Sequence, residues 1–394
     1  KTVGRPSIDS YDQVAFPETG GLFHWVTPET DITFTCTDLP REHPSGDEVL
    51  FLKVSYDLAG DGFVTEEYCT KYNGVMENGW CKIPVGNTPF VFNFNANEDS
   101  VHDLEYYCQD AVGKHGERQI QYYKVDSTPP SIDKSMLGEE GVDYLGECPP
   151  DQNSNDECYV ADNGRGGVHV DAVDGGAICA VDVVSCYYAV WWQTIQDNCN
   201  GNNQDYPYVD GWCKVAHGSF GSSTDILFTE DSNHRLEISC RDALGNEVED
   251  VELFKVDSTP PVTVKTYGPE GTYYVDQNTG AEWIGPATLI SMDASDNKVG
   301  VDKTFYKVSA VDGNYFCQSS YNCEDWNPSD WNSGGWTEYS TPFNDINQSC
   351  HVIEFYSVDL LGNTEEVQWQ CPFVDDTPPE GIKLVGEPHV VKLQ

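Results

Sequence analysis

The sequence predicts an all-β protein built from three tandem β-sandwich domains. One six-residue phrase recurs at domain-length intervals, at residues 125–130, 256–261 and 374–379. Short stretches rich in β-branched and aromatic residues alternate with turn residues, as in strands joined by tight connections. No stretch of useful length shows the 3.6-residue apolar period of an amphipathic helix. Each interval is long enough to bury its own core, so we expect one domain per interval.

The recurring phrase reads Val-Asp-Ser-Thr-Pro-Pro twice and Val-Asp-Asp-Thr-Pro-Pro in its third copy. Valine suits the end of a strand, and Asp and Thr bond their own backbone in turns. The two prolines offer no amide donor and keep the preceding threonine extended. We therefore expect a semi-rigid joint that divides the chain into domains 1–126, 127–257 and 258–376, followed by a linker and extra strand at 377–394.

Each predicted domain repeats the same order of strands and turns. A first strand carries a lysine with a glycine shortly after it; then come a strand ending in an acidic turn, a middle strand, and a long strand before a hairpin turn. The lysines of the first strand are Lys1, Lys134, Lys265 and Lys383. The strand that ends in an acidic turn is 32–38, 177–182 and 289–293, and the middle strand is 49–54, 185–190 and 304–308. The long strand before the hairpin turn is 102–108, 234–240 and 351–357.

The Thr-Pro-Pro endings and the Asp-x-x-Gly-Asn turns at 242–246 and 359–363 resemble the immunoglobulin-like repeats of bacterial and archaeal cell-surface proteins. The resemblance covers most of the chain. It implies immunoglobulin-like β-sandwich domains. From this resemblance together with the cysteines and the C-terminal tail, we predict three tandem immunoglobulin-like β-sandwich domains with disulfides, plus a C-terminal donor-type strand. Such repeats occur in adhesins, surface-layer proteins, enzyme spacers and filaments, so the resemblance selects an architecture and not an activity.

The chain is strongly acidic, with 66 Asp and Glu against 21 Lys and Arg and a formal net charge of −45. Such a surface repels nucleic acid and anionic lipid. Two interpretations remain for the charge: a solubilising acidic coat, or a surface that holds divalent cations.

The fifteen cysteines indicate disulfides formed in an oxidising, extracellular setting, because no paired Cys-x-x-Cys zinc arrangement is present. No apolar run approaches the length of about 18 residues that a membrane helix needs. The sequence opens at Lys1 without a Met or a signal peptide, so we expect either a processed mature segment or a piece of something longer.

Comparison of the domains with one another suggests two disulfides through the core. Early and late strands carry Cys36 and Cys108 in the first domain and Cys179 and Cys240 in the second. The third domain has Ser291 and Ser357 at these places, and the joint loss of both thiols is expected of a bonded pair. We therefore predict Cys36–Cys108 and Cys179–Cys240, each worth ~2–5 kcal/mol.

Further disulfides are predicted within inserts and loops. Gly-Trp-Cys-Lys recurs at 79–82 and 211–214, and its cysteine has a natural partner shortly before it. The predicted pairs are Cys69–Cys81, Cys199–Cys213, Cys148–Cys158, Cys317–Cys323 and Cys350–Cys371. Cys186 is left over, either as a buried thiol or for an intermolecular bond.

No catalytic constellation is found in the sequence, so we expect a protein that is not an enzyme. The nine histidines are scattered and no nucleophile, zinc-protease or phosphate-loop motif occurs. His102, His234 and His351 recur at the start of the same strand, which favours a structural role.

Calcium is the candidate cofactor, because hard oxygen ligands crowd several loops. The first candidate set is Asp293, Asp296, Asn297 and Asp302. Acidic loops at 57–61 and 151–157 are further candidates, and none of the three matches an EF-hand.

Tryptophans are concentrated in or beside polar inserts of the second and third domains, at Trp191, Trp192, Trp326, Trp331 and Trp336. They suit stacking on sugars, a protein contact, or packing of the insert on its own domain. Asn347 begins an Asn-x-Ser sequence and is a candidate glycosylation site.

Residues after the third joint look like the first strand of a fourth unit, with Ile382, Leu384, Val391 and Leu393 as its apolar positions. A lone strand cannot bury such a face. Either the tail adds to another copy, giving a head-to-tail homopolymer, or the chain is a fragment of a longer array. We expect a structural subunit of an extracellular filament or surface layer; the alternative is an adhesin that binds cell-surface glycans or partner cells through its Trp-rich loops.

Overall fold

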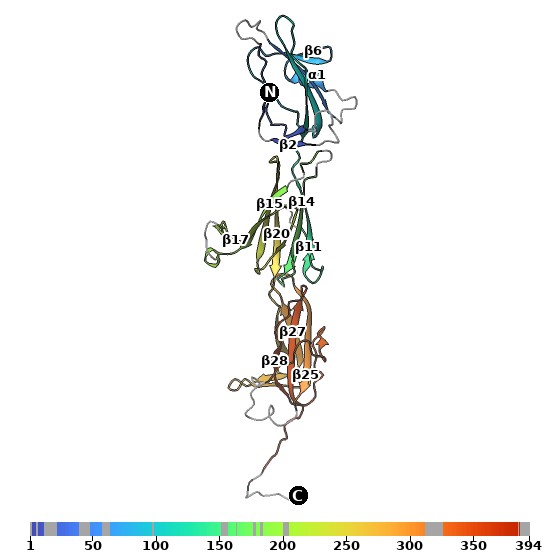
Figure 1. Ribbon diagram of the computed structural model, residues 1–394. Coiled ribbons are helices and arrows are strands. Elements are labelled where there is room, and N and C mark those ends of the chain that lie inside the picture. Colours follow the sequence, from blue (N-terminus) through green and yellow to red (C-terminus); the bar gives the residue numbers. More distant parts are fainter. Residues whose placement is uncertain are drawn as a thin grey trace. The chain divides into compact units, whose positions relative to one another are not determined.

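The computed structural model describes all residues except 1, 5–6, 12–21, 39–47, 57–63, 97, 151–156, 163, 176–178, 182–183, 200–204, 312–325, 385 and 387–394. The described part is nearly all β, as predicted, and contains one α-helix. Its strands form three sets, here called repeats 1 to 3, each with a small sheet and a larger sheet (Figure 1).

Repeat 1 encloses one core between its two sheets. Ile32 and Phe92 of the small sheet and Leu50 and Leu104 of the large sheet are fully buried together. The small sheet is β1 (Thr2–Val3), β4 (Ile32–Phe34) and β8 (Phe90–Phe92). The large sheet is β2 (Ser7–Tyr11), β3 (Leu22–Val26), β10 (Gln119–Val125), β9 (Ser100–Gln109), β5 (Val49–Tyr56), β7 (Trp80–Pro84) and β6 (Val75–Glu77), and helix α1 is Thr65–Lys71.

Repeat 2 has the same strand order. The small sheet is β11 (Ser131–Leu137), β14 (Gly167–Val173) and β18 (Ser223–Leu227). The large sheet is β12 (Tyr144–Gly146), β13 (Cys158–Ala161), β20 (Glu247–Asp257), β19 (Asn233–Asp242), β15 (Val184–Gln193), β17 (Trp212–Phe220) and β16 (Tyr208–Val209), with a 3-10 turn at Gln196–Asn198. Alternate residues of β19 are buried, as expected of a strand with one face on a core.

Repeat 3 keeps this plan with shorter sheets. Its small sheet is β21 (Val262–Gly268) and β24 (Leu289–Ser295). Its large sheet is β22 (Tyr273–Val275), β23 (Glu282–Ile284), β29 (Pro372–Val374), β27 (Ser349–Asp359), β25 (Val301–Ala310) and β26 (Thr337–Glu338), and β28 (Gln368–Gln370) also pairs with β27. Ile290 and Met292 of β24 share a core with Ile353 and Phe355 of β27.

The chain forms two compact units. The first comprises Lys1–Leu137, Gly146–Cys158 and Gly166–Lys255, and the second comprises Gly138–Leu145, Tyr159–Arg165 and Val256–Gln394. Two segments of repeat 2 thus belong with repeat 3. The division into three domains at 126, 257 and 376 stays a prediction.

Four predicted disulfides are confirmed: Cys36–Cys108, Cys69–Cys81, Cys148–Cys158 and Cys199–Cys213. Cys350 and Cys371 are both disulfide-bonded, but the bond expected between them is not among those of the described residues. Cys317 and Cys323 lie outside the described residues.

The predicted Cys179–Cys240 bond is wrong, because Cys240 is bonded to Cys186. These two residues face each other on β15 and β19, with Cα atoms 4.1 Å apart. Cys179, instead of Cys186, remains a buried thiol. Strand register decides which cysteines pair. The sequence comparison matched Cys179 with Ser291 of the third domain, and this match led to the wrong partner for Cys240.

Repeat 3 fills the position of this disulfide with hydroxyl groups. Thr304 and Ser357 are opposite one another on β25 and β27, as Cys186 and Cys240 are on β15 and β19. Their hydroxyl oxygens are 2.8 Å apart, and the Thr263 hydroxyl lies 2.6 Å from that of Ser357. The thiols of repeat 2 are therefore replaced by a buried hydrogen-bonded group, which avoids unsatisfied polar atoms.

The strand predicted at the C-terminus is not formed in the described part of the tail. Residues 377–384 form no strand, and the side chains of Ile382 and Leu384 are 81% and 89% exposed. Val391 and Leu393 lie outside the described residues.

Replacing both Cys186 and Cys240 with Ala should lower the free energy of unfolding by ~2–5 kcal/mol, because the unfolded chain loses a cross-link. Cys179→Ala should cost only about 1 kcal/mol, as a small buried side chain is shortened. Urea denaturation measures both changes. Peptide mapping under non-reducing conditions supplies the control, and a peptide joining Cys179 to Cys240 would contradict the assigned bond.

Candidate cation sites at two aspartate clusters

The aspartates of the first two joint phrases lie at the ends of strands and are completely buried. Asp126 follows β10 and Asp257 ends β20, and each has 0% of its surface exposed. One carboxylate oxygen of each accepts the backbone N–H of the threonine two residues later, at 3.1 Å. This is the self-bonding turn that the phrase predicts.

The other oxygen of each joint aspartate accepts a hydrogen bond from the following repeat. Val181 N–H donates to Asp126 Oδ2 at 3.1 Å, and Val299 N–H donates to Asp257 Oδ2 at 3.3 Å. The joint aspartate thereby connects the strand that ends one repeat with a loop of the next.

A second aspartate comes from the Asp-x-x-Gly-Asn hairpin turn. Asp242 Oδ1 accepts the backbone N–H of Asn246 at 2.9 Å, and Asp359 Oδ1 accepts that of Asn363 at 2.8 Å. The Asn246 side chain donates to the backbone carbonyl of Asp126 at 3.3 Å. Asn363 donates to the carbonyl of Asp257 at the same distance. The turn is therefore tied to the joint in both places.

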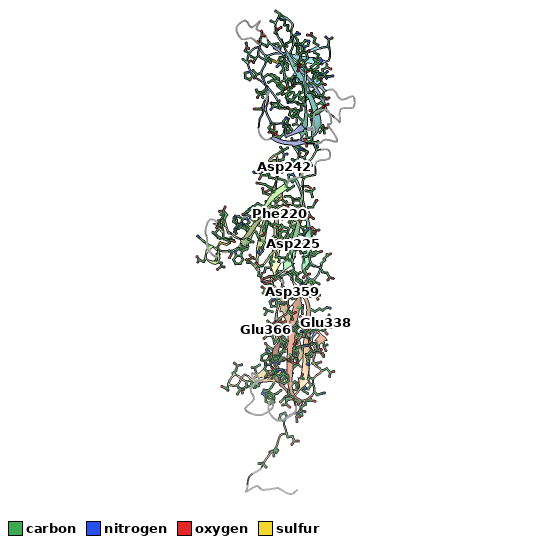
Figure 2. All side chains as sticks on the ribbon, viewed as in Figure 1. Phe220, Asp225, Asp242, Glu338, Asp359 and Glu366 are labelled. Carbon is green, nitrogen blue, oxygen red and sulfur yellow. A yellow bond between two sulfur atoms is a disulfide. The ribbon has the colours of Figure 1, made fainter. Side chains whose placement is uncertain are left out.

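A third aspartate completes each group and follows directly after a strand of the small sheet, β14 in repeat 2 and β24 in repeat 3. The first cluster is Asp126, Asp174 and Asp242, and the second is Asp257, Asp296 and Asp359. In each cluster one ligand atom per residue lies within 4.8 Å of the others. Asp242 and Asp359 are labelled in Figure 2.

Burial and like charge act together on these carboxyl groups. Burial raises the pKa of Asp126 to about 7, with further increases from Asp174 and Asp242, against lowering hydrogen bonds from Thr128 and Val181. Burial likewise raises the pKa of Asp257 and of Asp359, and Asp296 adds to both shifts.

The clusters could hold a hard divalent cation. Carboxylate oxygens about 2.4 Å from Ca²⁺ are separated from one another by less than about 5 Å, which matches the observed grouping. A bound cation would offset the negative charge of the three carboxylates in each cluster. In the second cluster Lys298 also contributes, with Nζ 3.9 Å from Asp257 Oδ1.

Only one predicted metal ligand belongs to a cluster. Asp296 lies in the second cluster, and its Oδ1 is buried without a hydrogen-bond partner among the described residues. Asp293, Asn297 and Asp302 are exposed and outside that cluster. The candidate loops 57–61 and 151–156 lie outside the described residues.

Sequence reasoning missed the other five cluster residues. It assigned Asp126 and Asp257 to turns and Asp242 and Asp359 to hairpins, which is correct locally. The available signal was the recurrence of these aspartates in two successive repeats. Only the fold brings residues so distant in the chain into one group.

Two groups of packed apolar side chains include residues that adjoin the clusters. Trp25 packs with Cys179 and Leu244, joined by Val101, Tyr122 and Val181. Near the second cluster, Ala161, Val299 and Leu361 pack with Leu145 and Tyr159. These contacts accompany the burial that raises the pKa values of Asp126, Asp257 and Asp359.

The recurring histidines have structural positions. His102 Nδ1 lies 3.2 Å from Ser100 O and Nε2 lies 3.3 Å from Glu98 Oε2. His234 repeats both contacts with Ser232 and Glu230 at the same distances. His351 is also buried.

Most of the candidate tryptophans pack on their own sheets. Trp191 is 8% exposed and donates to Glu237 at 2.7 Å. Trp336 is half-buried, with its ring edge on Tyr356 at 4.8 Å. Trp192 and Trp326 are also half-buried, whereas Trp331 is 49% exposed. Asn347 is exposed, as a glycan acceptor must be.

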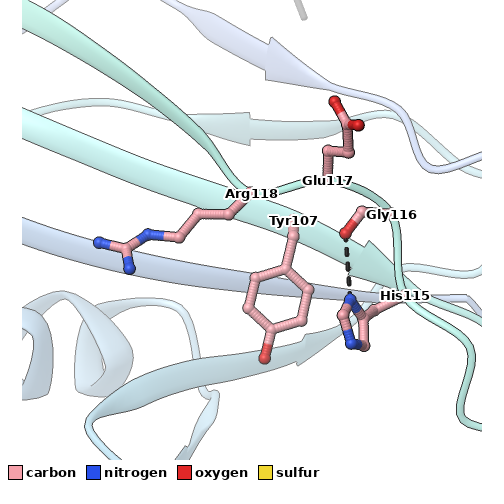
Figure 3. A pocket seen from close by; sticks show the side chains of 5 residues that line it. All are labelled: Tyr107, His115, Gly116, Glu117 and Arg118. Atoms are coloured by element: carbon pink, nitrogen blue, oxygen red, sulfur yellow. Dashed lines mark hydrogen bonds between the residues drawn. The ribbon is translucent and has the colours of Figure 1, made fainter.

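A separate hollow lies on repeat 1 at the end of the β9–β10 hairpin (Figure 3). Tyr107 lies between Arg118 and His115 in Figure 3, and its ring and that of Trp80 are T-shaped, with centroids 4.9 Å apart. The Arg118 guanidinium lies 5.4 Å from the centre of the Trp80 ring. The hollow is lined by Tyr107, His115, Gly116, Glu117 and Arg118.

No family model and no curated protein matches the chain. Among solved structures, the chain is similar to dimeric latent PorU from Porphyromonas gingivalis, at 11% identity and a TM-score of 0.18. The match covers 90% of this chain and 32% of PorU. A similarity this weak supports no statement about function.

Calcium should stabilise the folded chain, because it binds the clustered carboxylates only when folding brings them together. At one hundred times its Kd, one site adds about 2.7 kcal/mol to the free energy of unfolding. The combined Asp126→Asn and Asp257→Asn variant should lose this response. Thermal melts with Ca²⁺ and with a chelator measure it. Asp133→Asn, which changes an exposed carboxylate, is the control, and equal responses in all three proteins would exclude the sites.

In chelator, the contribution of Asp126 to stability should fall as the pH rises from about 4 to about 7. The folded state keeps a proton that the unfolded chain has already released, because the folded pKa is raised to about 7. Asp126→Asn should flatten the pH dependence of the unfolding free energy in this window. Urea titrations at several pH values measure the slope, and an unchanged slope would contradict the raised pKa.

Proposed function

We propose that the chain is a structural subunit of an extracellular filament or surface layer. In this proposal its repeats are three immunoglobulin-like sandwiches, it is not an enzyme, and molecules join head to tail through strand addition by the C-terminal tail. The observation that carries the proposal is the exposure of Ile382 and Leu384 after the third joint phrase, at 81% and 89%. Side chains two apart in an extended strand share one face, which suits pairing with another sheet.

Three features support an extracellular structural role. Five disulfides join described residues, which is compatible with a secreted protein. The net charge of −45 disfavours nucleic acid as a partner. Among the described residues, no helix has the length and apolar character to cross a membrane.

An adhesin that binds glycans is the second candidate function. The hollow at Tyr107, His115 and Arg118 places an aromatic ring beside the Arg118 guanidinium, and Trp331 is half-exposed. Aromatic faces stack on sugars, and Arg binds acidic groups. The packing of Trp191 and Trp336 on their own sheets gives this candidate less support than the Trp-rich inserts alone suggested.

Deletion of residues 380–394 should abolish head-to-tail assembly, because the donated strand is lost. Negative-stain electron microscopy and sedimentation of the full chain and the truncated chain measure the result. Replacement of Ile382 and Leu384 by Ser, which keeps the tail length, is the matched variant. Assembly by the truncated chain would exclude strand donation, and glycan binding by the monomer that is lost in Tyr107→Ala would favour the adhesin.

A further inference from the structure

The third joint phrase has the local structure of the first two, but the residues that are buried in the first two phrases are exposed in the third. Thr377 N–H donates to Asp375 Oδ1 at 2.9 Å, and Asp375 N–H donates to Ile284 O at 3.0 Å. The latter bond matches that from Asp126 N–H to Val26 O, also 3.0 Å. Asp375 and Pro379 are nevertheless exposed, whereas Asp126, Asp257 and the corresponding prolines are buried. The third phrase thus has the turn of a joint without the burial seen at the other two.

An aromatic pair, the exposed Trp283 and the half-buried Phe373, lies beside Asp375. Trp283 and Trp25 occupy equivalent positions. Trp283 comes just before Ile284, which pairs with Val374 of a parallel strand, and Trp25 comes just before Val26, which pairs with Val125 in the same way. Trp25 packs with Leu244 and is 9% exposed, but Trp283 is 42% exposed and stacks on Phe373 at 4.6 Å. Trp283 is therefore more exposed than Trp25, which packs with Leu244 of the following repeat.

Repeat 1 exposes the complementary half. Its hairpin turn, residues 110–114, corresponds to 242–246 and 359–363. Asp110 Oδ1 accepts the backbone N–H of Val112 at 3.0 Å and that of Lys114 at 2.8 Å, as in the other turns. Val112 is 69% exposed, whereas its counterparts Leu244 and Leu361 are 4% and 5% exposed. The residue that covers the preceding repeat elsewhere faces solvent here.

Strand β4 of repeat 1 ends earlier than its counterparts in the other repeats. In repeat 2, β14 continues to Val173, just before Asp174, because Ser131, which follows the prolines, pairs with Val173. In repeat 3, Val262 pairs with Ser295 just before Asp296. β4 ends at Phe34, and Asp38 is four residues further on. Residues 35–37 therefore lie outside any strand. In the other two repeats, the equivalent residues pair with the strand that begins after the two prolines.

We propose that the C-terminal end of repeat 3 docks on repeat 1 of a second copy and rebuilds the same joint between molecules. Trp283 and Phe373 cover Val112, and Asp375 joins Asp38 and Asp110. Residues 380–382 pair antiparallel with 35–37, with Glu380 opposite Thr37. The inference rests on the proposed function and specifies the face and register of its contact.

Two features define this contact further. Thr2 and Val3 already pair with Thr33 and Ile32, so donated pairing is confined to residues before Lys383. Lys114 replaces the asparagine of the other two turns and brings a positive charge to the three carboxylates. The contact between molecules therefore carries its own compensating charge, and salt should weaken it.

Two full-length variants, each altered at one end, test the proposal. Val112→Asp removes the repeat 1 face and leaves the repeat 3 face, and Trp283→Glu does the reverse. Each alone should associate at least about tenfold more weakly than the unaltered chain, a loss of about 1.4 kcal/mol. An equimolar mixture should form dimers and no longer species, because one intact contact remains. Sedimentation velocity measures these species, and circular dichroism verifies folding.

Val75→Asp and Leu253→Glu alter residues of comparable exposure, 65% and 52%, away from both faces and should assemble normally. Lys114→Glu should also weaken association, since it adds a fourth negative charge. If the unaltered chain assembles and needs its tail, while the Val112 and Trp283 variants assemble equally well, this inference fails and strand donation stands. If these variants fail but the truncated chain assembles, the docking of the two faces stands, whereas strand donation and the pairing of residues 380–382 with 35–37 fail. A chain that stays monomeric at every concentration overturns both.

Discussion

The burial of one carboxylate at each joint is the constraint on which the organisation of the chain depends. An ionised group in a water-free place needs hydrogen bonds or opposite charge. Asp126 and Asp257 obtain hydrogen bonds from their own turn and from a loop of the next repeat. Each joint aspartate is thus hydrogen-bonded both within its own turn and to a loop that follows it in the chain.

Two further aspartates beside each buried carboxylate make the joint sensitive to its surroundings. A proton or a hard cation relieves the repulsion within the first cluster, where the pKa of Asp126 rises to about 7. The second cluster has Lys298 nearby and needs less external charge. One backbone arrangement is therefore compatible with different means of charge compensation, and Lys114 offers another at the exposed end of repeat 1.

The same tolerance appears in the cores. A disulfide joins Cys186 to Cys240, and hydroxyl groups of Thr304 and Ser357 occupy the corresponding cross-strand position. Both solutions leave no polar atom of these pairs without a partner, so the backbone plan survives the exchange. What does differ between repeats is exposure at the ends: Val112 and Trp283 are exposed where Leu244 and Trp25 are covered. This difference in exposure distinguishes Val112 and Trp283 from the equivalent residues at the first joint.

The sequence by itself determined the all-β class, the repeated joint and the disulfides that close short loops, such as Cys69–Cys81 and Cys199–Cys213. Local spacing and turn chemistry suffice for these features. Only the tertiary structure decided that Cys240 meets Cys186, because strand register sets which residues are opposite. It also decided that Asp126, Asp174 and Asp242 form one group, since sheet topology gathers residues far apart in the chain. The exposure of Asp375, in a phrase almost identical to two buried ones, likewise depends on what packs against it and not on its own sequence.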